Sequence, residues 1–321
     1  MATDVIDSLK RVSQECIENL RYLAVDVGSP PKSLNPKIQW IQTSGFPDMQ
    51  FSGCVFANEF LDAMPVHRVT IRDGHLYELY VDVDEEGAFT ETVGTPSTGA
   101  IADRFDRLGI RLTEGYRAEI NLGLESWLLE IRNSMESGYL VIIDYGHLSS
   151  SYYDETRRTG TLRCYHRHIV NANPYIHIGD QDISIHVDFS SVRYEAEKLG
   201  FQYCGYTTQS NFLNNLGLEL YRHDIEQDPS SALPAKRANL RALDTLVDSA
   251  GMGGFKVMVL SKDMPEVPLQ GFNSLDKDYH KGLFSSPGFA PIAGPGHLAW
   301  EYAKVRETSI PSWKDMLEYD R

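Results

Sequence analysis

The chain has 321 residues, of which 42% are hydrophobic and 23% charged, and its formal net charge is −15 at pH 7. This composition is typical of a globular protein with a sizeable core, and the acidic balance excludes nucleic acid as a partner, because a phosphate backbone requires a basic face. The four cysteines lie far apart and form no CxxC pair, which predicts reduced thiols rather than a zinc ribbon or a disulfide framework. No apolar run approaches the ~20 residues of a membrane span, and neither a secretory signal nor an Arg-rich transit peptide is visible.

Helices and strands alternate through the first part of the chain. The spacing of apolar residues predicts a helix over 3–20, and short apolar runs predict strands over 21–30, 37–43 and 53–57. Because these runs are continuous rather than alternating, they indicate buried strands in a parallel sheet that is covered on both faces.

Residues 66–93 have a different pattern. Period-two stretches interrupted by DG and EEG predict an antiparallel hairpin or meander. After it the helix and strand patterns return, with predicted helices at 122–136, 190–199, 210–216 and 234–249, and predicted buried strands at 138–146, 201–209 and 254–262.

Two segments have the composition of irregular structure. Residues 147–188 are rich in His, Arg and Tyr and are predicted to form a long loop, and this content favours function over disorder. Beyond residue 262 the chain becomes turn-rich at 285–296. The last residues, 297–321, are predicted to form one or two peripheral helices that dock on the core or on another subunit. The second alternative would make the protein a homo-oligomer.

Acidic side chains follow three of the predicted strands: Asp26, then Glu59 and Asp62 beside Asn58, then Asp144. Ligands of open parallel sheets bind beyond the carboxyl ends of the strands, so these acids predict a site for a cationic or polyhydroxyl ligand. Two alternatives stay open. Asp26 could cap the next turn, and Asn58 could begin a helix whose first turn carries both acids.

Histidines gather in the predicted loop at positions 166, 168, 177 and 186, close in sequence to Cys164. A metal site is one interpretation, but a pair of histidines two residues apart, without HExxH or CxxC, is weak support for it. The alternative is that polar side chains of this segment hold the loop over the pocket by hydrogen bonds; these are Arg163, His168, Asp182, His186 and Asp188.

Four motifs occur in the order NEFLDAMPVH, IIDYGH, GTLRCYHRH and DQDISIHVDFS, and they resemble those of the MidA-like methyltransferases. That family includes a mitochondrial complex I assembly factor that methylates an arginine of a complex I subunit, together with many bacterial relatives. The resemblance implies a class I methyltransferase domain over 1–261, an α/β Rossmann-like sheet with helices on both faces that uses S-adenosylmethionine (SAM). Residues 66–93 would be a β-hairpin insertion, 147–188 an active-site region, and 262–321 a C-terminal extension.

The resemblance also implies roles for individual residues. Asp26, Asn58 and Glu59 would bind the cofactor, with Asp26 at the ribose, and no metal is expected. Glu59, Asp62 and Asp144 are the expected catalytic residues, because a charged, delocalised guanidinium has to be held bidentately and relieved of a proton. The expected substrate is a protein that presents an arginine, and its binding residues would be Tyr145, His147, Arg163, Tyr165, His168 and His186.

One departure from the family affects this interpretation. The family's glycine-rich loop, which holds the methionine part of SAM, would precede the first helix, and these 321 residues contain no GxGxG. We favour a start placed too late over a deliberate fragment or a diverged protein that has lost SAM binding. The rival functions are a non-catalytic assembly or binding protein and, more distantly, a metal-dependent hydrolase. The expected location is the cytoplasm of a bacterium, or the mitochondrial matrix if a eukaryotic targeting segment lies upstream.

Overall fold

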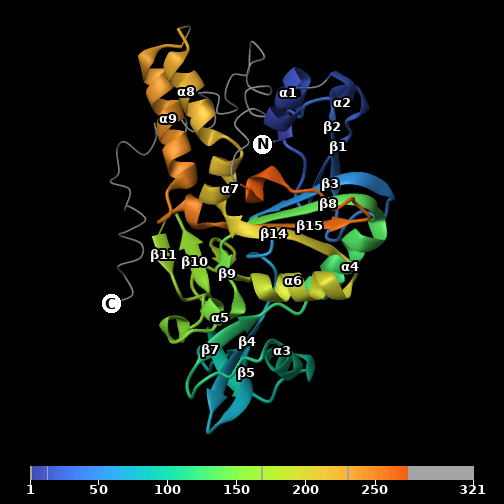
Figure 1. Ribbon diagram of the computed structural model, residues 1–321. Helices are drawn as coiled ribbons and strands as arrows, with labels where there is room; N and C mark the ends of the chain where they lie inside the picture. Colours follow the sequence, from blue (N-terminus) through green and yellow to red (C-terminus); the bar gives the residue numbers. More distant parts are fainter. Residues whose placement is uncertain (1, 13, 168, 230, 274–321) are drawn as a thin grey trace. The chain divides into compact units, whose positions relative to one another are not determined.

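The computed structural model describes residues 2–12, 14–167, 169–229 and 231–273, and it has the mixed α/β architecture that the sequence predicts (Figure 1). The contacts divide the chain into two compact units. Unit 1 comprises 1–49, 207–254 and 265–321, and unit 2 comprises 50–206 and 255–264. Each unit is described by itself.

The N-terminal part of unit 1 contains two helices and two strands: α1 (Ala2–Val12), α2 (Gln14–Asn19), β1 (Tyr22–Asp26) and β2 (Ile38–Gln42). β1 and β2 run parallel, and a small apolar cluster forms around Ile6, Ile17 and Ile38. The two predicted strands are confirmed at shorter bounds. The predicted burial of β1 is wrong: its residues are half-buried or exposed, and β2 is its neighbour in a sheet of only two strands.

The rest of unit 1 is helical: α7 (Gln209–Asn215), α8 (Leu218–Gln227), α9 (Leu233–Val247), and the 3₁₀ turns η2 (Met252–Gly254) and η3 (Gln270–Phe272). Leu218 and Ile225 of α8 pack with Leu243 of α9. The sequence predicts α7 and α9. It missed α8, whose apolar residues are thinly spread among charged ones.

The main sheet of unit 2 has the strand order β14-β15-β8-β3, in which β3 is Phe51–Asn58, β8 is Met135–Asp144, β14 is Gln202–Thr208 and β15 is Lys256–Lys262. β3 runs parallel to β8, as predicted, but β15 runs antiparallel to β8. The sheet is therefore mixed: the predicted parallel pairing holds for β3 and β8, and β15 adds an antiparallel strand, as in many α/β sheets.

Burial in this sheet decreases from β8 towards β3. From Gly138 to Asp144 every second residue of β8 is buried. The helices α4 (Leu124–Ser134) and α6 (Phe189–Lys198) lie side by side against one face of the sheet (Figure 1). β3 was predicted to be buried, but its residues 52–54 are exposed. The reason is its position, because β3 is the edge strand of the sheet in the described part of the chain.

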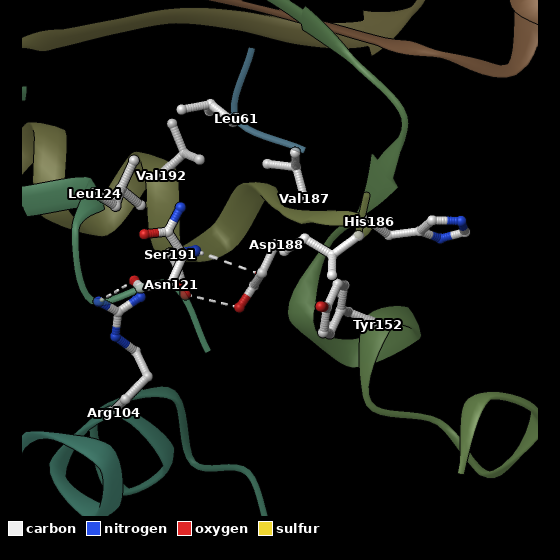
Figure 2. Close-up of a pocket in the computed structure, with 11 residues that line it drawn as sticks. Leu61, Arg104, Asn121, Leu124, Tyr152, His186, Val187, Asp188, Ser191 and Val192 are labelled. Carbon is white, nitrogen blue, oxygen red and sulfur yellow. Dashed lines mark hydrogen bonds between the residues drawn. The ribbon is translucent and has the colours of Figure 1, made fainter. Parts of the chain in front are cut away.

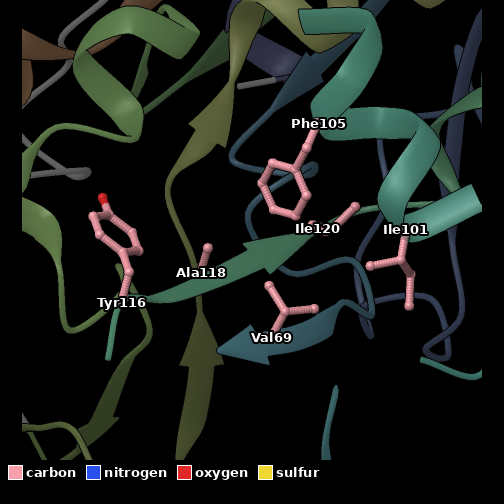
Figure 3. Packing of buried hydrophobic residues seen from close by; sticks show 6 residues of the cluster. All are labelled: Val69, Ile101, Phe105, Tyr116, Ala118 and Ile120. Carbon is pink, nitrogen blue, oxygen red and sulfur yellow. The ribbon is translucent and has the colours of Figure 1, made fainter. Parts of the chain in front are cut away.

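The predicted meander at 66–93 is confirmed. β4 (His67–Arg72), β5 (His75–Val83) and β6 (Phe89–Gly94) form an antiparallel sheet in which β7 (Arg117–Ile120) pairs with β4. The sequence missed α3 (Ala100–Leu108), which packs on this sheet. Figure 3 shows their shared core of Val69, Ile101, Phe105, Tyr116, Ala118 and Ile120.

The long loop predicted over 147–188 is instead a series of short elements: β9 (Gly146–His147), α5 (Ser149–Tyr152), η1 (Glu155–Arg157), β10 (Arg163–His166), β11 (Ile169–Asn171), β12 (Asp182–Ser184) and β13 (Val187–Asp188). β10 pairs with β11 and β12, and β9 pairs with β13 across some 40 residues of sequence. Such long-range pairs leave little periodicity, and the sequence pattern therefore did not reveal them.

The turn-rich linker at 285–296 and the peripheral helices predicted for 297–321 lie outside the described residues. None of the described helices is both long and apolar enough to cross a membrane.

A buried carboxylate in the meander gives a pH-dependent prediction. Burial raises the pKa of Glu78, but hydrogen bonds from His67, the Ser97 amide and the Tyr80 hydroxyl outweigh it and lower the pKa to about 2. A lowered carboxyl pKa stabilises the fold above the unfolded pKa of ~4.3, and this contribution is lost as the pH falls through 2. We expect Glu78→Gln to lower the free energy of unfolding by ~1–3 kcal/mol at pH 7. The difference from the unsubstituted protein should vanish between pH 5 and 2, as measured by urea denaturation. A stability difference that stays constant over this pH range would contradict the lowered pKa of Glu78.

Candidate functional site

The site begins where β3 ends. Asn58 is the last residue of β3 and pairs with Ile143 of β8, and the amide of Glu59 donates a hydrogen bond of 2.8 Å to the Ile143 carbonyl oxygen. Glu59 has φ 47°, in the left-handed region that residues other than glycine rarely adopt. Strain of this kind persists where the surroundings enforce it and is concentrated at functional sites.

Asp144, the last residue of β8, fastens the segment after Glu59. Its buried carboxylate accepts the backbone N–H groups of Leu61 at 3.0 Å, Asp62 at 3.3 Å and Tyr145 at 2.9 Å. Burial and the neighbouring charge of Asp62 raise the pKa of Asp144 to about 8. With both oxygens engaged by the backbone, Asp144 has the environment of a positioning residue rather than of a group that meets a substrate.

Glu59 and Asp62 form a pair of acids with few partners. Tyr145 donates a short hydrogen bond from its hydroxyl group to one oxygen of Asp62, and the other oxygen is buried with no hydrogen-bond partner within the described residues. Burial raises the pKa of both carboxyls, and the charge of Asp62 raises that of Glu59 further. In the described part of the chain no ion pair joins either acid to a cation. Such a pair favours a positively charged ligand.

Tyr165 of β10 faces these acids. Burial raises its pKa, and the charges of Asp62 and Glu59 raise it further, whereas Arg163 lowers it. β10 is anchored from its other side, because Cys164 packs with Leu162 and Ile185 in a small core. The alternation of a strand therefore points Cys164 into the core and Tyr165 towards the acids.

A close approach of two backbones places the histidines. β9 and β13 run parallel, with Gly146 beside Val187 and His147 beside Asp188. A Cβ atom on Gly146 would lie 2.1 Å from the Val187 carbonyl oxygen, so only glycine fits at this position.

This contact gives a second prediction. We expect Gly146→Ala to lower the free energy of unfolding by ~2–3 kcal/mol, since the two strands have to separate to make room for the methyl group. The control is Gly99→Ala, where an added Cβ meets nothing within 4 Å. Urea denaturation followed by circular dichroism measures both, and equal stabilities of the two variants would contradict the packing argument.

His147 and His186 lie beside Tyr145. The ring centroids of His147 and His186 are 5.3 Å apart, and those of Tyr145 and His186 are 5.5 Å apart. Burial and nearby cations lower the pKa of His147 to about 4 and that of His186 to about 3, so both imidazoles are neutral at pH 7.

The described structure has a cavity of about 30 Å³, room for a single water molecule, whose lining includes His186 but neither Glu59 nor Asp62 (Figure 2). It is lined by Arg104, Asn121 and the backbone and side chains around Asp188. His186 borders it, but its ring points away from the cavity (Figure 2). The cavity is therefore not the candidate site.

Two predicted site residues are not among the described residues of unit 2. Asp26 belongs to unit 1, where its carboxylate accepts the amide of Gly28 at 2.7 Å, as in the turn-capping alternative. His168 lies outside the described residues. Within the described chain no three His, Cys, Asp or Glu side chains are grouped as a metal would require.

Sequence reasoning missed Arg157 and Lys256, whose charges act on both histidines. Lys256 pairs with Asp144 in the β15–β8 ladder, a contact over more than 100 residues of sequence that no local pattern reveals.

A comparison of the sequence with models of protein families identifies the family of the chain. Residues 1–207 match the model of a family described as "Putative S-adenosyl-L-methionine-dependent methyltransferase", the MidA-like family. This match covers more than half of the chain. The chain belongs to this family. The resemblance found in the four motifs is thereby confirmed.

The chain is also similar to individual proteins of known sequence or structure. The chain is 28% identical over 232 residues to the mitochondrial protein arginine methyltransferase NDUFAF7 homolog of Drosophila melanogaster, with 68% of this chain and 50% of that protein aligned. It is 27% identical to NDUFAF7 of Homo sapiens, with 76% of this chain and 52% of that protein aligned. A solved structure from Burkholderia thailandensis bound to S-adenosylhomocysteine has TM-score 0.66 and 32% identity over 76% of this chain and 61% of that one. The chain thus spans about half the length of these curated relatives.

Proposed function

We propose that this MidA-like chain acts as a SAM-dependent protein arginine methyltransferase and that it binds the arginine of its protein substrate. The observation that carries the proposal is the Glu59–Asp62 pair just after β3: an exposed and a buried carboxyl group, both with raised pKa, and one unpartnered oxygen on Asp62. The curated relatives named arginine methyltransferases support it. Because some of these relatives are named mitochondrial, a matrix protein linked to complex I assembly is part of the proposal if the source is a eukaryote.

The proposed roles follow from the chemistry of the guanidinium group. Glu59 and Asp62 hold it by charge-assisted hydrogen bonds and align one nitrogen, and a carboxylate with a raised pKa is able to accept the proton that leaves on methylation. Tyr145 orients Asp62 through its hydroxyl group. Asp144 contributes indirectly, since it holds the backbone of the segment that carries both acids.

For the cofactor the fit of the described residues is partial. Asp26 uses one carboxylate oxygen for the Gly28 amide, which leaves the other for a ribose hydroxyl group, and Asn58 donates a hydrogen bond of 3.3 Å to Glu59 at the end of β3. When bound, SAM supplies a methyl group on a sulfonium sulfur. The residues of unit 2 would present the arginine to it and exclude water.

The test of the proposed function uses two measurements on the purified protein. Calorimetry with S-adenosylhomocysteine measures cofactor binding, and transfer of a radiolabelled methyl group from SAM to an arginine-containing peptide measures activity. Methylarginine in the product is the expected result. Binding of the peptide without any transfer would favour the rival function.

That rival is a non-catalytic assembly or binding protein built on the same fold. Two features oppose it, because a scaffold has no need of them: the strained backbone of Glu59 and the buried, unpartnered oxygen of Asp62.

A further inference from the structure

A second group of charged side chains adjoins the Glu59–Asp62 pair in unit 2. Tyr145 connects the two groups: its hydroxyl group donates to Asp62, and its ring packs against the rings of His186 and Phe255 at centroid distances of 5.5 and 5.4 Å. Beside this ring lies a group of basic side chains, here called the cationic cluster: the charged Arg157, Arg163 and Lys256, together with the neutral imidazoles of His147 and His186.

Backbone pairing brings members of the cluster together: Arg163 pairs with Ser184, two residues before His186, and Lys256 pairs with Asp144, three residues before His147. After burial, the charges of Arg157 and Lys256 lower the pKa of both His147 and His186, and Arg163 acts on His186 as well. The pKa of Lys256 is itself lowered by burial and by Arg157. This is a concentration of positive charge in a chain whose net charge is −15.

The backbone fixes the cluster independently of these charges. The β9–β13 pair places His147, and Lys256 is held opposite Asp144 in the β15–β8 ladder. The Nδ1 atom of His186 is buried and has no hydrogen-bond partner within the described residues. Arg157 is held by Asp154 at 3.1 Å and by the Ser151 carbonyl oxygen at 2.8 Å.

We propose that the cationic cluster binds a carboxylate group of the protein substrate, so that the enzyme recognises an arginine accompanied by an acidic residue. The inference rests on the proposed function, because it adds an anionic subsite to the same site. A neutral imidazole still has one N–H group, which can donate to a carboxylate oxygen. A monoanion fits better than a phosphate dianion, since Glu59 and Asp62 nearby repel the second charge.

The test compares two sets of acetylated, amidated peptides with a single arginine. One set carries a glutamate one to four positions after the arginine, and the other carries glutamine there. We expect calorimetry to show ~10-fold tighter binding for the best glutamate peptide than for its glutamine partner. In ¹³C NMR of histidine-labelled protein, the pKa of the His186 ring should rise only with the glutamate peptide, because a bound carboxylate stabilises the imidazolium.

Variants identify the side chains that cause the preference. Arg163→Gln and Lys256→Gln should each bring the affinity ratio close to one. Arg111→Gln removes the same charge from an exposed side chain that pairs with Asp106, and it should keep the tenfold ratio.

The outcomes separate the inference from the function on which it rests. Equal affinities for the two sets, with an unchanged pKa of His186, would overturn the anionic subsite and leave the arginine site standing. If S-adenosylhomocysteine alone raises that pKa and the peptides do not differ, the carboxylate belongs to the cofactor and the inference is wrong. Failure of both peptide sets to bind would overturn the proposed function together with the inference.

Discussion

The Glu59→Gln variant should lose arginine methylation while its fold is retained. The substitution keeps the shape of the side chain but replaces one oxygen by an NH₂ group, which presents a donor to the donors of the guanidinium. We expect kcat/KM to fall at least ~100-fold, about 2.7 kcal/mol of transition-state stabilisation, and the affinity for an arginine peptide to fall with it.

Two measurements check this result: methyl transfer from radiolabelled SAM, and calorimetric binding of the peptide. Calorimetry applies even where turnover is slow, so the test of the acid does not depend on the cofactor. The matched control is Glu85→Gln, which makes the same change in an exposed turn of the meander. If Glu59→Gln and Glu85→Gln bind the peptide equally well, Glu59 is not part of the arginine clamp.

The Asp144→Ala variant should show the largest loss of stability. It leaves the buried N–H groups of Leu61, Asp62 and Tyr145 without an acceptor, and each such group costs ~1–3 kcal/mol. We expect the free energy of unfolding to fall by ~3–5 kcal/mol, in the range of other broken buried networks.

Urea denaturation measures this change, with Asp106→Ala as the control. Asp106 forms an exposed ion pair with Arg111, and such pairs contribute at most ~1 kcal/mol. Asp144→Asn is the informative intermediate, because the amide keeps one acceptor, and we expect a loss of ~1–3 kcal/mol. A loss of less than ~1 kcal/mol in Asp144→Ala would show that the N–H groups find water instead and that Asp144 does not hold the segment.

The acids at the ends of strands are the part of the site that could be predicted from the sequence. The polar residues that follow Ala57 and Ile143 break an apolar run abruptly, and parallel neighbours must bring such ends together. Their relation to Asp26 could not be obtained in the same way, because Asp26 ends a strand of the other unit. The roles predicted for these residues stay predictions until the variants are measured.

No pattern in the sequence indicated that Arg157 and Lys256 belong to the site. Arg157 lies in a 3₁₀ turn of the segment that the sequence predicted as one loop, and Lys256 begins a strand that was predicted without a direction. Only the antiparallel register of β15 sets Lys256 opposite Asp144 and within reach of the histidines. Long-range pairing of this kind depends on the whole fold, which local periodicity does not encode.

The sequence by itself determined the α/β class, the family through four motifs, and the acids at the ends of β3 and β8, because apolar patterning and strand-end chemistry are local properties of the chain. The tertiary structure decided which acid is free for a substrate: it turned Asp144 towards backbone amides and left an oxygen of Asp62 without a partner. It also assembled the cationic cluster from β9, η1, β10, β15 and the residue that precedes β13. Burial and register depend on contacts between distant segments, and so they appear only when the chain is folded.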